Sequence, residues 1–254
     1  MEMHERISLA TALLREARYP IALTGAGIST PSGIPDFRSE GSGLWERVDS
    51  TQVASFSGFR SRPDAFYRWI RPMVQMVTSA SPNAAHRAIA EMEKNGRLRA
   101  VITQNIDNLH TRAGSHRVIE LHGHFRTATC IRCYQSVGGT IVIDFLQNQE
   151  GVPICPGCGG VLKPDIVLMG EQLPYAAAQA ALSEARRCDV MLIAGTSLLV
   201  EPAASLPVLA QKCGARLILV NLQPTEMDQV ADVVVNEDVA VVLPLLAASV
   251  SRVQ

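Results

Sequence analysis

The stretch Thr24-Gly-Ala-Gly-Ile-Ser-Thr-Pro-Ser-Gly-Ile-Pro-Asp-Phe-Arg38 directly follows a short apolar run, Ile21-Ala-Leu23. A strand that ends in Gly-x-Gly lets the backbone approach a ligand closely, with free N–H groups that face an anion such as a pyrophosphate. Thr30 stands where the full dinucleotide-binding motif has its third glycine, so the motif is incomplete. The stretch therefore predicts a nucleotide-binding turn at the end of a strand.

The loop after these glycines contains Pro31, Gly33 and Pro35, which exclude a long regular helix. It then presents an acidic, an aromatic and a basic side chain in the run Asp36-Phe-Arg38. Two interpretations remain open. The loop forms a polar and aromatic lid over a bound cofactor, or it is a surface loop that Phe37 anchors to the core.

The composition is that of an ordinary globular protein, with 47% apolar and 19% charged residues in a chain of 254. This length accommodates one large domain, alone or with a small insert. The charged first residues lead into a helical pattern without a cleavable signal, so we expect a cytoplasmic protein. A net charge of −1 gives no reason to expect nucleic acid or a membrane surface as a partner.

Short apolar segments alternate with helical patterns along most of the chain. A helical insert is expected from Pro63, with Pro72 kinking or ending it, and the next helix opens at Ser81-Pro82 and stops at Asn95. Later strands are expected at 98–103, 117–121, 166–169, 189–194, 216–220 and 232–235, and helices at 174–187, 203–213 and 239–248. This alternation predicts an α/β fold, a doubly wound parallel sheet covered on both faces.

Polar or small residues follow each of the predicted strands. In an open parallel sheet, ligands bind beyond the carboxyl ends of the strands, so these residues are expected to converge on one crevice. They are Gly25, Gln104, Asn105, His122, Gly123, Gly170, Glu171, Gly195, Thr196, Ser197 and Asn221.

Two Cys-x-x-Cys pairs, Cys130 with Cys133 and Cys155 with Cys158, have the spacing of two turns that hold one metal ion. Four thiolates favour tetrahedral Zn²⁺, although iron fits the same ligands. A site with four protein ligands has no open position, so a zinc ion here is expected to be structural.

The six cysteines also admit other interpretations. Two disulfides require an oxidising compartment, which nothing in the sequence indicates. A zinc ribbon can bind nucleic acid, but the nearby basic residues are few and scattered. Cys188 and Cys213 are expected at helix ends as buried thiols rather than nucleophiles.

The run Thr103-Gln-Asn-Ile-Asp-Asn-Leu-His110 places two amides and a carboxylate directly after a strand. These groups can bind the carboxamide and ribose of NAD, or they can form a capping network at the start of a helix. Glu120-Leu-His122-Gly123 ends another strand in an imidazole that can act as a general base, and its glycine is expected to leave room for substrate. The other histidines are expected to be surface or structural groups.

Taken together, these motifs closely resemble the sirtuins, which are NAD-dependent protein lysine deacylases. The likeness runs from about Leu13 to Val239. Its remaining motifs are Lys-Pro-Asp-Ile-Val from Lys163, Gly-Glu at Gly170, Gly-Thr-Ser-Leu from Gly195 and Val-Asn at Val220.

The resemblance implies a Rossmann-like NAD-binding large domain made of residues 1–36, 82–124 and 165–254. A small domain would combine a helical insert, 37–81, with the zinc module, 125–164, and NAD and acyl-lysine would bind in the cleft between the two. In the sirtuin reaction, the acyl oxygen attacks the ribose carbon that bears nicotinamide, and a histidine deprotonates a ribose hydroxyl. The products are free lysine, nicotinamide and O-acyl-ADP-ribose.

The same resemblance assigns roles to individual residues. His122 matches the catalytic histidine, and Asn105, the second residue assigned to catalysis, matches a position near the ribose. The matching NAD contacts are Gly25, Ala26, Gly27, Ile34, Asp36, Phe37, Arg38, Gln104, Asn105, Ile106, Asp107, Gly195, Thr196, Ser197, Asn221 and Val239. The substrate peptide would add as a strand between 170–173 and 200–202, with contacts from Val167, Met169, Gly170, Glu171, Leu173, Val200 and Glu201. Glu171 and Glu201 would favour basic peptides.

Two departures concern the acyl group. Many deacetylases of this family have Phe-Gly-Glu where this chain has Met169-Gly-Glu171, and a flexible thioether there could admit longer acyl chains. The Tyr-x-x-Arg of the succinyl-preferring branch lacks its arginine, because Ile70 stands three residues after Tyr67. Acidic acyl groups are therefore not expected.

Two further kinds of function remain open beside deacylation. One is an NAD-dependent protein ADP-ribosyltransferase or NAD hydrolase, against which the presence of both His122 and Asn105 argues. The other is a non-catalytic module that senses NAD or binds through its zinc ribbon.

Overall fold

The computed structural model describes residues 2–36 and 53–251. By backbone contacts the chain divides into two compact units. Unit 1 comprises Met1–Ser32, Ser81–Leu121 and Tyr175–Gln254, and unit 2 comprises Gly33–Ala80 and His122–Pro174. Each unit is therefore assembled from separate pieces of the chain.

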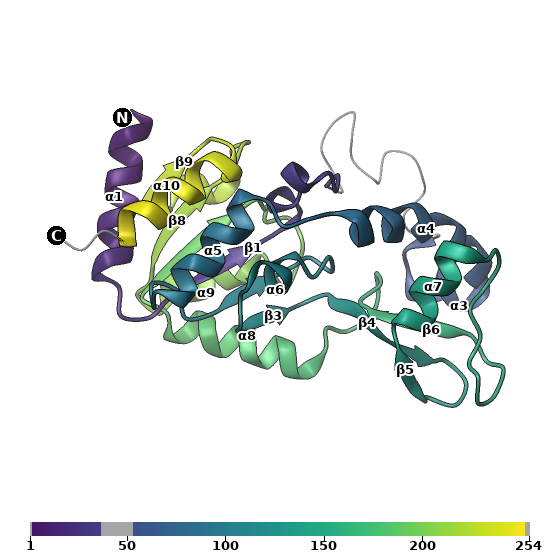
Figure 1. Ribbon diagram of the computed structural model, residues 1–254. Helices are drawn as coiled ribbons and strands as arrows, with labels where there is room; N and C mark the ends of the chain where they lie inside the picture. The colour runs from purple at the N-terminus through teal and green to yellow at the C-terminus, as the bar shows by residue number, and fades with distance from the viewer. Residues whose placement is uncertain (1, 37–52, 252–254) are drawn as a thin grey trace. The chain divides into compact units, whose positions relative to one another are not determined.

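Unit 1 contains a six-stranded parallel sheet (Figure 1). Its strands are β1 (Pro20–Thr24), β2 (Val101–Thr103), β3 (Val118–Glu120), β7 (Val190–Ala194), β8 (Arg216–Val220) and β9 (Val233–Val235). Their order across the sheet is β3-β2-β1-β7-β8-β9, so the winding direction reverses between β1 and β7. This is the order of a Rossmann-like doubly wound fold, which confirms the predicted fold class, and ligands bind such sheets at the reversal.

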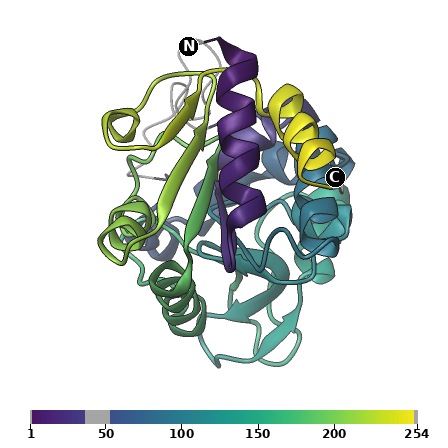
Figure 2. The same ribbon diagram turned by 90° about the vertical axis from the view of Figure 1, so that its left-hand side faces the viewer.

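Helices cover both faces of this sheet (Figure 2). They are α1 (Met3–Glu16), α5 (Ala84–Lys94), α6 (Leu109–Ala113), α8 (Tyr175–Arg187), α9 (Ser205–Lys212) and α10 (Val239–Ser251), with short 3-10 turns η1 (Ala26–Ile28), η2 (Thr30–Ser32) and η4 (Glu226–Gln229). Helices α1, α5 and α10 share one apolar cluster with the sheet. Every residue of β1 and β7 is buried, as expected for strands covered on both sides.

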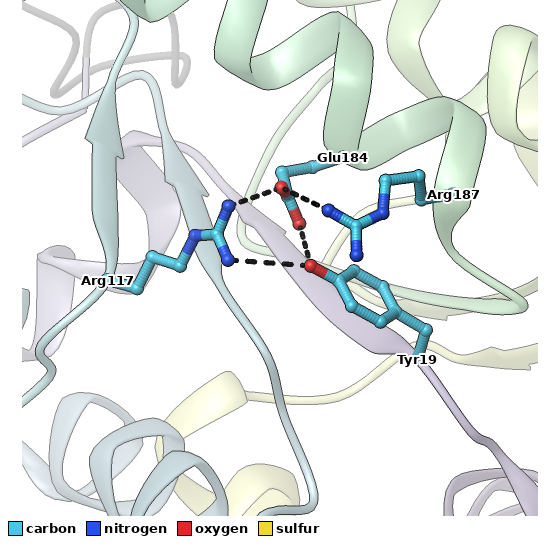
Figure 3. A network of polar contacts seen from close by, with 4 residues as sticks. All are labelled: Tyr19, Arg117, Glu184 and Arg187. Atoms are coloured by element: carbon cyan, nitrogen blue, oxygen red, sulfur yellow. Dashed lines mark hydrogen bonds and ion pairs between the residues drawn. The ribbon is translucent and has the colours of Figure 1, made fainter.

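A charged cluster joins the amino ends of β1 and β3 to helix α8 (Figure 3). The Glu184 side chain is only 2% exposed, and it accepts hydrogen bonds from Arg117 at 2.6 Å and from the Tyr19 hydroxyl at 2.9 Å. The Arg187 guanidinium lies 4.4 Å from the centre of the Tyr19 ring. A buried carboxylate needs such partners, and this cluster lies at the amino ends of the strands, where ligands of such sheets do not bind.

Unit 2 combines a three-stranded antiparallel sheet with helices (Figure 1). Its elements are α3 (Phe56–Ser61), α4 (Pro63–Ser79), β4 (Gly123–Cys130), β5 (Ser136–Gly138), α7 (Thr140–Asn148) and β6 (Leu162–Ile166), with strand order β5-β4-β6. The hydroxyl of Tyr67 and the guanidinium of Arg71 donate hydrogen bonds to the carbonyls of Leu162 and Leu146. The helical insert and the cysteine-bearing segment therefore pack as one unit.

The structure corrects several expected elements. The strand expected at 166–169 is β6, which ends at Ile166 and pairs antiparallel with β4 in unit 2. Residues 33–36, 122–124 and 165–174, which the expected division gave to the large domain, fall in unit 2, and Ser81 falls in unit 1. Pro72 does not end α4, which continues to Ser79. Among the helices described, none is both long and apolar enough to cross a bilayer.

Candidate active site

The loops that follow β1 and β7 meet where the sheet reverses its winding. Gly27 donates its N–H to the carbonyl of Gly195 at 2.8 Å, and Gly25 donates to Ala194 at 3.3 Å. A Cβ atom on Gly195 would lie 2.3 Å from the Ile28 nitrogen, and its φ of +62° is one that side chains disfavour. The expectation that Gly25 and Gly27 offer free N–H groups to an anion is thus wrong, because the last residue of β7 and the residue after it accept both hydrogen bonds.

Four strand ends converge here, as the sequence predicts. The Thr196 N–H donates to the Asn221 side chain at 2.9 Å, and the Asn221 amide donates back to the Thr196 carbonyl at 3.0 Å. Gln104 joins the pair by donating from Nε2 to the Thr196 hydroxyl at 2.9 Å, while its backbone N–H bonds to Thr24 at 3.0 Å. The ends of β1, β2, β7 and β8 therefore form one polar edge.

A buried polar triad lies at the same edge. Ser29 donates to the Asp107 carboxylate at 2.6 Å, and Asn105 donates from Nδ2 to Ser29 and to the Gly25 carbonyl, each at 3.1 Å. Ser29, Asn105 and Asp107 are 1%, 9% and 6% exposed. Burial raises the pKa of the Asp107 carboxyl, although the hydrogen bonds it accepts oppose the rise.

Asp107 meets the capping interpretation of the run after β2 and also makes a contact outside the cap. Its Oδ1 accepts the Leu109 N–H at 2.8 Å at the start of α6, which is the capping role. Its Oδ2 instead accepts a hydrogen bond from the Ser29 hydroxyl, in the loop after β1, and this contact has no part in capping. One carboxylate therefore caps a helix and joins the glycine loop to the strand end.

Two histidines, expected from the sequence to be surface or structural groups, lie next to this triad. His86 and His110 are both buried, with ring centres 4.9 Å apart. The His86 ring lies 3.4 Å from the Ser29 hydroxyl and the His110 ring 2.9 Å from that of Thr24. Burial lowers the pKa of His86 to about 4 and of His110 to about 3, so both rings are neutral at physiological pH.

His86 is the contact that sequence reasoning missed. A signal for it was present, because His86 stands three residues after Asn83, which caps α5. The capping box holds its Nδ1 within 3.4 Å of the Asn83 N–H and leaves Nε2 on the side of Ser29.

His122 begins the second piece of unit 2 and is partly exposed. Its carbonyl accepts the Val167 N–H at 2.8 Å, which pairs it with the residue after β6. Gly123 has a φ of +75°, and a Cβ there would lie 2.0 Å from the Asp165 carbonyl oxygen. The expected reason for this glycine was wrong: β6, not substrate, occupies the space beside it.

The predicted substrate residues fall in both units. Val167, Met169, Gly170, Glu171 and Leu173 belong to unit 2, and Val200 and Glu201 belong to unit 1. The Glu171 carboxylate is already bound within unit 2, since its Oε2 accepts the Leu168 N–H at 2.8 Å and lies 2.9 Å from the Lys163 ammonium. Glu201 is exposed and accepts the Ser205 hydroxyl at 2.6 Å.

The other predicted cofactor contacts have varied surroundings. Ile34 is buried and Asp36 half-buried, both in unit 2, and Phe37 and Arg38 lie outside the described residues. Ala26 and Ile106 are half-buried in unit 1, where Ser197 is exposed. Val239 begins α10 with its side chain in the hydrophobic core, so the side chain itself is not available to a nucleotide.

The four predicted metal ligands come together in unit 2. The sulfur atoms of Cys130, Cys133, Cys155 and Cys158 all lie within 4.8 Å of one another. Two of the separations, Cys130 to Cys158 and Cys133 to Cys155, are 3.5 and 3.8 Å. Zn–S bonds of about 2.3 Å in a tetrahedron separate the sulfurs by about 3.8 Å, so the cluster fits one zinc ion.

The two remaining cysteines differ from each other. Cys188 is buried at the end of α8, and burial raises its pKa to about 12, as expected for an inert thiol. Cys213, at the end of α9, is exposed, so the prediction that it is buried was wrong.

Comparison with known proteins gives consistent matches over nearly the whole chain. The sequence model of the Sir2 family matches residues 25–202. NAD-dependent protein deacylase 2 of Archaeoglobus fulgidus is 44% identical over 254 residues, covering 99% of each chain. A solved structure from a study of the mechanism and regulation of Sir2 enzymes has 43% identity and a TM-score of 0.90, covering 97% of this chain and 98% of that one. A Sir2 complex with an inhibitor, 2′-O-acetyl-ADP-ribose and deacetylated p53 peptide has 39% identity and a TM-score of 0.85, covering 96% and 100%.

Proposed function

The chain belongs to the Sir2 family and is an NAD-dependent protein lysine deacylase, and from this premise we propose that His122 is its general base. Bound NAD supplies the ADP-ribose that accepts the acyl group and the nicotinamide that leaves, so the products are free lysine, nicotinamide and O-acyl-ADP-ribose. An imidazole titrates near neutrality, so a nitrogen of the His122 ring can take up the proton that an acceptor hydroxyl loses.

We propose that unit 1 is the NAD-binding domain. The observation that carries this proposal is the buried triad of Ser29, Asn105 and Asp107 at the point where the sheet reverses. Buried hydroxyl, amide and carboxylate groups can orient a ribose and a carboxamide, which a purely apolar loop cannot do. Gly25, Gly195 and Thr196 would lie near the phosphates, and Asn221 near the adenosine.

Unit 2 would supply the general base and the surface for the acylated peptide. The Met169 N–H bonds to the Ala54 carbonyl at 2.9 Å, and the Met169 carbonyl accepts the Phe56 N–H at 3.0 Å. Met169 therefore has no backbone group left for a peptide, and pairing with an added strand would begin at Gly170 and continue through Leu173. Recognition through the backbone predicts tolerance of many peptide sequences.

The four-cysteine cluster is proposed to hold zinc as a structural ion. All four sulfurs are used within the cluster, so none is left for a reacting group, and the ion would stabilise the connection between β4 and β6. None of the six cysteines forms a disulfide, and disulfides are rare in proteins of reducing compartments. This supports the proposal that the protein works in the cytoplasm.

The proposed function is tested by supplying NAD with and without an acetyl-lysine peptide. Nicotinamide release that depends on the peptide, with O-acetyl-ADP-ribose detected by mass spectrometry, is expected. His122→Ala should reduce turnover by at least about a hundredfold while NAD still binds, and the exposed His116→Ala serves as a matched control. Full activity of His122→Ala would remove this residue from its role, and peptide-independent release would indicate an NAD hydrolase.

A further inference from the structure

The segment from Ile166 to Glu171 links the proposed base to the proposed peptide surface, and nearly every residue in it is held by a hydrogen bond. Val167 donates its N–H to the His122 carbonyl at 2.8 Å. Met169 pairs on both sides with Ala54 and Phe56. Leu168 and Glu171 close a turn, because the Glu171 N–H donates to the Leu168 carbonyl at 3.0 Å.

One ion pair holds both ends of this segment. The Lys163 ammonium lies 2.9 Å from Glu171 Oε2 and donates to the Ile166 carbonyl at 2.8 Å and the Pro164 carbonyl at 3.3 Å. The same Oε2 accepts the Leu168 N–H at 2.8 Å. The three protons of the ammonium thus have three acceptors, and the lysine joins β6 to the turn that follows it.

This pair differs from an ordinary surface ion pair in its burial. The side chains of Lys163 and Glu171 are 13% and 19% exposed, whereas those of Arg68 and Asp64 on α4 are 74% and 51% exposed. Exposed pairs contribute little, because water screens them and both side chains lose freedom. A largely enclosed pair that also satisfies backbone groups fixes a geometry more firmly.

We propose that Lys163 and Glu171 are a positioning pair, which sets the acyl-lysine turn at 168–171 and the backbone of His122 through a single segment. The inference rests on the proposed function of His122 and of this turn. Glu171 then acts through the turn it holds and does not recognise basic peptides with its own charge. A shift of about 1 Å in a positioning segment can cost as much as a hundredfold in rate.

The test compares Lys163→Met, Glu171→Gln and the double variant, with Arg68→Met as the matched control. For each, kcat and KM are measured for an acetyl-lysine peptide and for NAD at a temperature well below the thermal midpoint. We expect peptide kcat/KM to fall by about tenfold or more in each single variant, with KM for NAD within about twofold of the wild type. The double variant should be no worse than the worse single one, because both act on one segment. Lys163→Arg, which keeps the charge, should restore part of the activity.

Three results would overturn the positioning role. The first is a lowered thermal midpoint with unchanged peptide kinetics, which would mean that the pair only stabilises the fold. The second is a double variant whose fold-loss in peptide kcat/KM equals the product of the fold-losses in the two single variants. The third is direct recognition of charge. In that case Glu171→Gln would lower kcat/KM only for peptides with basic flanks, and Lys163→Met would raise kcat/KM for the same peptides. Glu171→Gln retains an acceptor for the Leu168 N–H, so it keeps the test available if Lys163→Met does not fold. Failure of the proposed function would instead show as peptide-independent nicotinamide release by the wild type.

Discussion

Gly27 donates its backbone N–H to the carbonyl of Gly195 at 2.8 Å, so two loops more than 160 residues apart in sequence are in direct backbone contact. A side chain on either glycine would prevent the contact, since a Cβ on Gly27 would lie 2.9 Å from the Gly195 oxygen. These glycines therefore let two loops pack closely where β1 and β7 end, which is also where the nucleotide is proposed to bind.

Gly195→Ala should destabilise the protein by about 2–5 kcal/mol and weaken NAD binding, because it adds a clash to a left-handed backbone. Urea unfolding and NAD titration would measure the two effects. Gly214→Ala is the matched control, since Gly214 has a φ of +96° but no atom within 4 Å of the added Cβ. Gly214→Ala should lower the unfolding free energy by about 1–2 kcal/mol, which is the effect of the left-handed backbone alone, and leave NAD affinity unchanged. Equal losses in the two variants would contradict the close-packing role of Gly195.

Cys155→Ala should remove zinc and unfold unit 2, because three ligands do not replace a closed four-thiolate site. Zinc content and circular dichroism would be measured together, before and after a chelator. Cys213→Ala provides the control, since this cysteine is exposed and outside the cluster. A Cys155→Ala protein that stays fully folded without metal would refute a structural zinc ion.

Most of the large unit could be predicted from the sequence because local patterns determine it. Strand β7 and the last four residues of β8 are continuous apolar runs, and the glycine and amide after them mark the carboxyl ends of the strands. The paired Cys-x-x-Cys spacing likewise identifies the metal ligands without any knowledge of the fold.

Long-range contacts explain what the sequence could not predict. The apolar run at 166–169 looks like a buried strand, but Ile166 pairs with β4 and Met169 pairs with Ala54 and Phe56, and these long-range contacts lie in unit 2. The role of Gly123 depends on the backbone of Asp165, and that of Glu171 on Lys163. His86 likewise reaches Ser29 across 57 residues of sequence.

Asp107→Asn should gain stability relative to the wild type as the pH rises, while losing activity. Burial makes the pKa of this carboxyl higher in the folded protein than in the unfolded chain. Its contribution to folding is therefore fully present below the unfolded pKa and lost as pH rises through the folded one. Asparagine does not ionise, so it does not lose this contribution. The unfolding free energy of the variant minus that of the wild type should therefore increase from pH 4 to pH 8.

Urea unfolding at several pH values measures this difference, and groups common to both proteins cancel in it. Asp144→Asn, at an exposed position in α7, is the control for the loss of one carboxyl group from the chain. An Asp107→Asn difference that stays constant over the pH range would show that the carboxyl is not perturbed by its surroundings.

Met169 should widen the range of acyl groups that the protein accepts. The residue is 37% exposed, while its backbone is held on both sides by Ala54 and Phe56, so only the flexible thioether can adapt to the acyl chain. We expect the wild type to use butyryl-lysine and longer acyl-lysine peptides as well as acetyl-lysine. Met169→Phe should reduce kcat/KM for the longer chains by about tenfold and change acetyl turnover by less than about threefold, because a ring is bulkier and stiffer than a thioether. Each variant's acetyl activity serves as its own control for folding, and a wild type that uses acetyl-lysine alone would show that residue 169 does not set the chain length.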